Sequence, residues 1–157
     1  MQRFSPGLFD RLADDDTPPH ALRRRTRATE AEACRQSITR DLMALLNTRS
    51  NVPALALAPL PKVAASVINY GLIDFAGMCM TSDTDQQKIC TAVRQAIEHH
   101  EPRLHKVSVT LTPKKGAINR VEFMITAELK SGVGMQPMSF NAVFRPSLQQ
   151  YSIDDAT

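Results

Sequence analysis

The sequence has few of the features on which enzyme chemistry depends. Its six glycines are scattered singly or in turns and form no glycine-rich phosphate loop. No serine, threonine or cysteine lies in a recognisable nucleophile motif. The cysteines Cys34, Cys79 and Cys90 make no C-x-x-C pair, and three of them cannot all pair within one chain. We therefore expect a non-enzymatic protein without a cofactor, in a reducing cytoplasm.

The chain also lacks a long uninterrupted apolar run. The segment from Met1 to Leu12 has no long apolar core behind a basic start, and three prolines and Lys62 interrupt the apolar stretch 52–67. A membrane-spanning helix needs about 20 consecutive, predominantly apolar residues. We expect neither a signal peptide nor a membrane-embedded segment.

Basic and acidic residues nearly balance along the chain, except in one short stretch. The formal net charge is +3, and much of the positive excess is an arginine run at residues 23–27, just after three aspartates at 14–16. Aromatic residues for base stacking are not interleaved with it, so nucleic-acid binding is not indicated. An alternative is an adaptor that uses this basic arm, whose binding would fall steeply with salt and be lost on deleting residues 21–28.

Helical spacing dominates the first two-thirds of the chain. Thr29 and Glu32 form a capping box, which predicts a helix from near Glu30 to about residues 47–49. Its apolar stripe consists of Cys34, Ile38, Leu42, Leu45 and Leu46. A proline-punctuated loop at 50–61, a short helix at 63–70 closed by Gly71, and a helix at about 84–100 follow.

The period of the pattern changes to two after Pro102. Three alternating runs, at about 106–112, 120–129 and 138–144, are separated by turn residues, and Pro146 ends the last run. The pattern predicts an α+β fold in which helices pack on one face of a three-stranded antiparallel sheet. We expect an anchoring segment and basic linker at 1–28, the α+β domain at 29–146, and a C-terminal tail at 147–157.

The densest polar cluster lies between the last helix and the first strand. His99 and His100 are neighbours that point about 100° apart, and Pro102 breaks the helix before His105. This spacing disfavours a zinc site, and we expect no metal. In Glu101-Pro102-Arg103, a rigid residue separates a carboxylate from a guanidinium, which fits either a local structural clamp or a contact with a partner.

Paired carboxylates leave a glycosidase open as an alternative. Glu101 would be the acid, with Asp41 or Asp74 as its partner. Hydrolysis needs the two carboxyl groups about 5 to 9.5 Å apart across a sugar cleft. The sequence does not place them there.

Four ordered blocks carry a resemblance to a known family: Arg40-Asp41-Leu42, the run 45–49 (LLNTR), the run 66–72 (SVINYGL), and 101–104 (EPRL). Together they resemble the TssE family of type VI secretion baseplate subunits, relatives of the contractile-phage baseplate wedge protein that carries an old lysozyme-like name. The blocks keep their order over about residues 4 to 145.

The resemblance implies a scaffold rather than an enzyme. It implies binding to TssF and TssG near TssK, in a cytoplasmic complex docked at the inner membrane, and a role in starting TssB–TssC sheath polymerisation. On this resemblance Glu101, Pro102 and Arg103 are the expected protein-binding motif. The residues expected to shape helix ends and loops are Asn47, Thr48, Arg49, Asn69, Tyr70 and Gly71.

Overall fold

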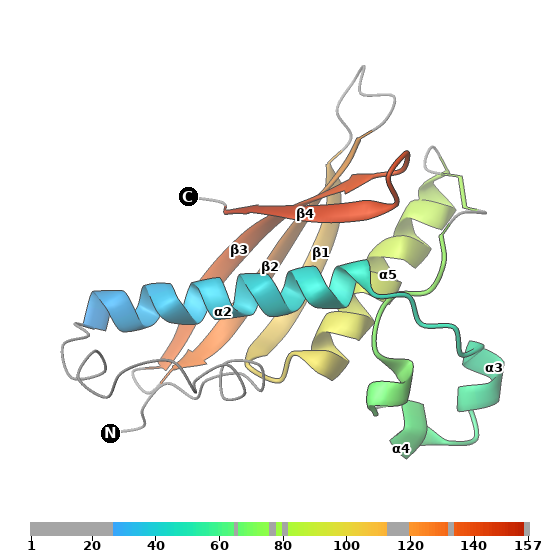
Figure 1. Cartoon of the computed structure of the whole chain (residues 1–157), viewed down its shortest axis with the longest axis horizontal. Coiled ribbons are helices and arrows are strands. Elements are labelled where there is room, and N and C mark those ends of the chain that lie inside the picture. The colour runs from blue at the N-terminus through green and yellow to red at the C-terminus, as the bar shows by residue number, and fades with distance from the viewer. Residues whose placement is uncertain are drawn as a thin grey trace.

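The longest helix buries the stripe that its spacing predicts. The computed structural model describes residues 27–64, 66–75, 78–79, 82–112, 120–131 and 134–155. Helix α2 spans Arg27–Asn47 and lies across the sheet (Figure 1). The predicted stripe is buried throughout, with every one of its five side chains at most 3% exposed. Each such side chain removed from water contributes about 1.5 to 3 kcal/mol, so this face fixes the helix on the sheet.

The second long helix leads directly into the sheet. Helix α5 spans Asp83–His100, with Asp83 and Asp85 in its first turn, where a negative charge favours the positive end of the helix dipole. Its buried residues Ile89, Val93 and Ile97 recur every four positions and form one face. Pro102 follows two residues after its end, and β1 begins at Leu104.

The sheet is fully antiparallel with strand order β1-β2-β3-β4. Its strands are β1 Leu104–Thr112, β2 Val121–Ser131, β3 Gly134–Arg145 and β4 Gln150–Asp155. Alternate residues such as Phe123, Ile125 and Phe140 are buried in the cluster that contains the helix stripes. The α+β class with helices on one sheet face is therefore confirmed.

The expected strand count was wrong, because the sheet has four strands rather than three. Strand β4 falls within residues 147–157, where we expected a tail. Tyr151 is 4% exposed, and its ring centroid lies 4.6 Å from that of Phe144. The strand carries only two large apolar residues, Tyr151 and Ile153, in six positions, so its pattern was too short to read. The predicted segment 1–28 lies outside the described residues except for 27 and 28.

A helical excursion, residues 50–71, separates α2 from the segment that leads to α5. It holds α3 Ala54–Leu57, α4 Pro61–Ala64 and the 3-10 helix η3 Val67–Asn69, and it projects beyond the end of α2 (Figure 1). Pro61 opens α4 as expected, but the single helix predicted at 63–70 is wrong. Ser66 interrupts it, because its hydroxyl accepts a hydrogen bond from the Ile68 N–H and starts η3 instead.

Within the described ranges, no helix has both the length and the apolar character needed to cross a membrane.

Candidate functional site

Glu101, Pro102 and Arg103 form the junction between α5 and β1. Glu101 is the C-cap residue of α5, and its N–H donates to the Ile97 carbonyl at 2.8 Å. The Glu101 side chain is buried although it is a carboxylate, whereas Pro102 is exposed. A buried carboxylate requires a partner, because removing its charge from water without compensation is costly.

Arg103 supplies that partner through a two-pronged contact. Its Nε donates to Glu101 Oε1 at 2.6 Å, and its Nη2 donates to Glu101 Oε2 at 2.5 Å. The same guanidinium reaches α2, where Nη2 donates to Asp41 Oδ2 at 2.5 Å and Nη1 donates to Ser37 Oγ at 3.0 Å. We call these four residues the Arg103 cluster. It ties the middle of α2 to the α5–β1 junction with charge-assisted hydrogen bonds.

The Arg103 cluster carries two carboxylates against one guanidinium. Burial raises the pKa of Asp41, although Arg103 opposes this rise. Burial alone would lower the pKa of Arg103, but the hydrogen bonds and charges of Glu101 and Asp41 outweigh it and raise that pKa. Within the described part of the chain, Asp41 Oδ1 is buried without a hydrogen bond, and Arg40 Nε lies 3.9 Å from it, within ion-pair distance. The cluster itself therefore has one more carboxylate than guanidinium, and Arg40 of α2 partly offsets the charge of Asp41.

The geometry of this cluster does not resemble a glycosidase site. Glu101 and Asp41 do converge, but on a single guanidinium rather than across a cleft. Glu101 is 4% exposed, so a polysaccharide could reach it only after the junction had opened. Asp74, the other proposed partner, lies exposed in the segment after Gly71. The alternative of a glycosidase centred on Glu101 draws no support from these positions.

The predicted motif at residues 47–49 connects the end of α2 to β4. Asn47 Nδ2 donates to the Tyr151 carbonyl at 3.0 Å, and the Tyr151 N–H donates to Asn47 Oδ1 at 2.8 Å. The carboxamide thus replaces a neighbouring strand at this point. Arg49 Nη2 donates to the Gln149 carbonyl at 3.3 Å, and Thr48 Oγ1 donates to the Ala44 carbonyl at 2.7 Å.

The second predicted motif, residues 69–71, closes the base of the excursion. Asn69 Nδ2 donates to the Ala64 carbonyl at 3.0 Å. Gly71 has a φ of +115°, and a Cβ there would lie 2.5 Å from the Thr48 carbonyl oxygen. Only glycine allows this close approach. The approach forms a parallel bridge, in which the Leu72 N–H donates to the Thr48 carbonyl and the Ser50 N–H to the Leu72 carbonyl, each at 2.9 Å.

The three histidines of the polar cluster have separate surroundings. His99 Nδ1 lies 2.9 Å from the Gln95 carbonyl oxygen, and His100 Nε2 lies 3.2 Å from the Asn69 carbonyl oxygen. His100 also packs edge-on against the Tyr70 ring, with centroids 5.2 Å apart. His105 is exposed on β1. In the residues that the structure describes, no group of three His, Cys, Asp or Glu side chains is arranged to hold a metal ion.

His100 gives the domain a predictable acid sensitivity. Burial lowers the pKa of His100 below its ordinary value of 6.5. The unfolded chain therefore binds a proton at a higher pH than the folded chain, and stability falls as pH decreases through this range. We expect the free energy of unfolding to fall between about pH 7 and pH 5, and His100→Gln to flatten that fall. Urea titrations of both proteins at each pH check this prediction. An equal fall of the unfolding free energy with pH in the wild type and in His100→Gln would contradict it.

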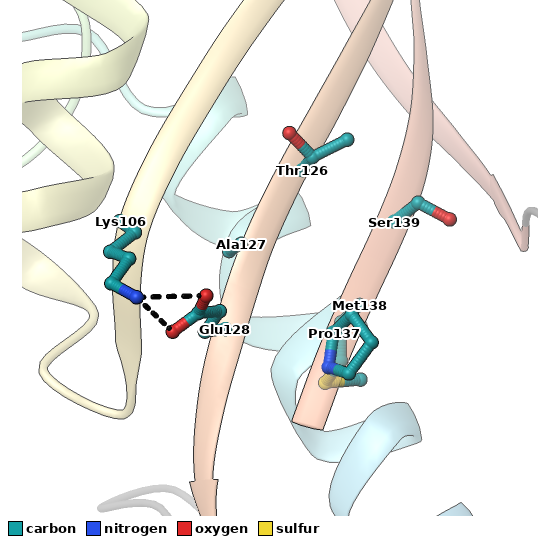
Figure 2. Close-up of a pocket in the computed structure, with 7 residues that line it drawn as sticks. All are labelled: Lys106, Thr126, Ala127, Glu128, Pro137, Met138 and Ser139. Carbon is teal, nitrogen blue, oxygen red and sulfur yellow. Dashed lines mark hydrogen bonds and ion pairs between the residues drawn. The ribbon is translucent and has the colours of Figure 1, made fainter. Parts of the chain in front are cut away.

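A shallow depression lies on the sheet face away from the helices, and none of the predicted site residues lines it. Figure 2 shows Thr126, Glu128 and Ser139 on this face, with Ala127 and Met138 turned toward the helix behind. Lys106 Nζ pairs with Glu128 Oε1 at 3.1 Å, so the two charged side chains that line the depression form an ion pair with each other. We assign no role to it.

Helices on one face of an antiparallel sheet, with a polar cluster at the junction of α2, α5 and β1, define a small α+β domain. Residues 32–132, about two-thirds of the chain, match the family model of the baseplate wedge protein gp25. The chain therefore belongs to the baseplate wedge protein gp25 family. The matched range contains the whole Arg103 cluster and ends within the β2–β3 hairpin.

Structural comparison agrees with this family at the level of the fold. The chain resembles one chain of a solved structure described as the baseplate complex from the type VI secretion system, with a TM-score of 0.50 and 17% identity. The match covers 73% of this chain and 96% of the other. No curated protein matches the sequence. The resemblance to baseplate wedge subunits is confirmed.

Proposed function

We propose that this protein is a structural, non-enzymatic wedge subunit of a type VI secretion baseplate. It binds TssF and TssG near TssK, in a cytoplasmic complex docked at the inner membrane, and helps start the polymerisation of the TssB–TssC sheath. Residues 1–28 serve as an anchoring segment and linker to this complex. The observation that carries the proposal is the Arg103 cluster, in a chain that belongs to the wedge family. Its polar groups bind one another and so hold α2 on the α5–β1 junction.

Glu101, Pro102 and Arg103 support the junction with the sheath in two ways. Inside the domain, the Glu101 and Arg103 side chains fix the angle between α2 and the start of β1. On the surface, Pro102 is exposed, and the Asp41 side chain of the cluster is 17% exposed, with a charge that Arg40 at 3.9 Å only partly offsets. A basic side chain of a partner subunit would compensate that charge.

The outer edge of β1 offers the contact for an added strand. At the opposite edge, Asn47 already occupies the outward N–H and carbonyl of Tyr151. Along β1, a bulge between His105 and Ser108 interrupts the first half of the strand, and Lys106 there has a φ of +51°. The regular part of the edge is therefore residues 108–112, in which the Leu111 N–H is directed at the Cys90 thiol of α5 and the Val109 N–H is the outward donor that remains for an added strand. The half-buried Val109 and Leu111 of this edge would be covered by an incoming strand.

Val109→Pro tests this edge. The Leu111 N–H points outward to the Cys90 thiol of α5, so the Val109 N–H, two residues away on the same side, also points outward. Proline removes that outward donor and leaves the ladder to β2 intact. We expect at least about a tenfold drop in the number of fluorescent sheaths in cells, since one main-chain hydrogen bond and the fit of the strand are lost.

Val109→Thr is the matched control, because it changes the side chain and keeps the N–H. Thermal unfolding of both purified variants establishes that each remains folded. Sheath numbers should stay near the wild-type value for Val109→Thr. Normal sheath numbers with Val109→Pro, in a folded protein, would exclude strand addition at β1.

A further inference from the structure

The outer edge of β1 presents two different rows of side chains. Ser108, Thr110 and Thr112 point to the face of the sheet away from the helices, and all three are exposed. Val109 and Leu111 point to the helix side, where they pack half-buried against the core. Successive side chains of a strand alternate between the two faces of a sheet. An added strand therefore places its residues in turn beside an apolar row and beside a hydroxyl row.

The inner row, Val109 and Leu111, selects apolar side chains in the added strand. Directly opposed residues of neighbouring strands have Cβ atoms about 4.5 to 5.5 Å apart, so a side chain facing this row leaves water as it packs. A charged group placed there would lose its hydration, and residues 108–112 contain no charged side chain to compensate it. Valine, isoleucine or leucine in the same place removes apolar surface from water and is favoured.

The outer row, Ser108, Thr110 and Thr112, selects small polar side chains. Ser108 lies opposite Thr126 of β2, and both are exposed. Threonine and serine pairs across neighbouring strands stabilise a sheet through hydrogen bonds between their hydroxyl groups. Threonine in the added strand extends this row and keeps its hydroxyl in contact with water, whereas a large apolar side chain there would stay exposed.

The main-chain groups of the edge discriminate against a second copy of this chain. Two β1 strands that pair antiparallel about Thr110 need the Leu111 N–H of each copy as a donor. That N–H is directed at the Cys90 thiol of α5. Pairing about Val109 instead sets Leu111 against Val107 of the other copy, inside the bulge. A strand of a different protein can pair through the Val109 N–H, the Val109 carbonyl and the Leu111 carbonyl alone.

We propose that the β1 edge recognises a short strand of a different protein in which apolar side chains, facing the helices, alternate with threonine or serine facing outward. The strand is about five residues long, since it pairs along residues 108–112 between the bulge and the end of β1. The inference rests on the proposed function, which assigns strand addition to this edge. It adds the sequence pattern that the donor strand of the sheath carries.

Two short synthetic peptides of identical sequence, valine alternating with threonine in equal numbers, test this pattern. N-methyl groups stand on every threonine of the first peptide and on every valine of the second. Only the residues without an N-methyl group can donate to β1, and a donating residue stands opposite Val109 or Leu111 with its side chain in the inner row. The first peptide therefore places valine in the inner row, and the second places threonine there. The N-methylated edge also prevents the peptides from stacking into larger sheets.

The full chain should bind the first peptide at least about tenfold more tightly than the second, because valine side chains leave water at the inner row in the first complex only. Affinity is measured by NMR from the shift of the Val109 N–H signal. Val109→Pro should lose this binding, followed at the Thr110 N–H, and thermal unfolding establishes that the variant remains folded. Equal affinities, or no shift with either peptide, would overturn the proposed pattern.

Hydrogen exchange at the Val109 N–H with purified TssB–TssC heterodimer separates that failure from failure of the proposed function. Slowed exchange beside equal peptide affinities would leave strand addition standing and exclude only the pattern. Unchanged exchange would exclude strand addition at β1 and the pattern together. A wild-type dimer in sedimentation that Val109→Pro dissociates would assign the edge to a second copy and likewise overturn the proposal.

Discussion

Arg103→Ala should destabilise the domain by about 3 to 5 kcal/mol, because it leaves one buried and one half-buried carboxylate without their cation. The side chains of Arg103, Asp41 and Glu101 are 16%, 17% and 5% exposed, so water compensates only part of the loss. Urea unfolding followed by circular dichroism gives the free energy. Arg103→Lys keeps the charge but loses the two-pronged geometry, and it should cost less, about 1 to 3 kcal/mol.

Lys88→Ala is the matched control for Arg103→Ala. Lys88 Nζ pairs with Asp85 Oδ1 at 3.3 Å, but the Lys88 side chain is 61% exposed. An exposed pair of this kind contributes little, because water and salt screen it, so Lys88→Ala should leave the stability close to that of the wild type. An Arg103→Ala protein as stable as Lys88→Ala would mean that the Arg103 cluster does not hold α2 on the α5–β1 junction.

Gly71→Ala should cost about 3 kcal/mol, the sum of an unfavourable backbone conformation and a steric conflict. The φ of +115° is one that residues with a Cβ rarely adopt, and the new Cβ would lie 2.5 Å from the Thr48 carbonyl oxygen. Backbone atoms cannot move aside as a flexible side chain can. The bridge between Arg49 and Leu72 should open, which would be measured as faster hydrogen exchange at the Leu72 N–H.

Gly134→Ala separates the two parts of that cost. Gly134 also has a positive φ, +129°, but nothing lies within 4 Å of its added Cβ. The substitution therefore carries only the backbone term and should cost about 1 kcal/mol. Equal losses for Gly71→Ala and Gly134→Ala would show that the close approach to Thr48 does not contribute.

The fold was predictable wherever the hydrophobic pattern was long. The α2 stripe and the alternation of β2 each extend over about ten residues or more, and both elements form as expected. Strand β4 was missed because six residues with two large apolar side chains carry too weak a pattern. Its position depends on tertiary contacts with Asn47 and Phe144, which no local pattern contains.

The sequence predicted residues of the site, Glu101 and Arg103 among them, but not their contacts with residues far away in the sequence. Glu101 and Arg103 are neighbours in sequence, so a clamp between them was already one interpretation. Their link to Ser37 and Asp41 spans 66 and 62 positions, and Asn47 reaches Tyr151 across 104. Polar residues on a helix surface carry no signal of such a partner, and only the packing of α2 on the sheet brings them together.

Sheath formation in cells that lack this chain tests the central claim most directly, beside a peptidoglycan assay of the purified protein. The account predicts few or no fluorescent TssB–TssC sheaths without the chain, restoration by the wild-type chain, and no muropeptide release in the assay. Sheaths at normal numbers without the chain, together with muropeptide release that Glu101→Gln abolishes, would contradict the scaffold function. That result would support the alternative that the protein is a glycosidase.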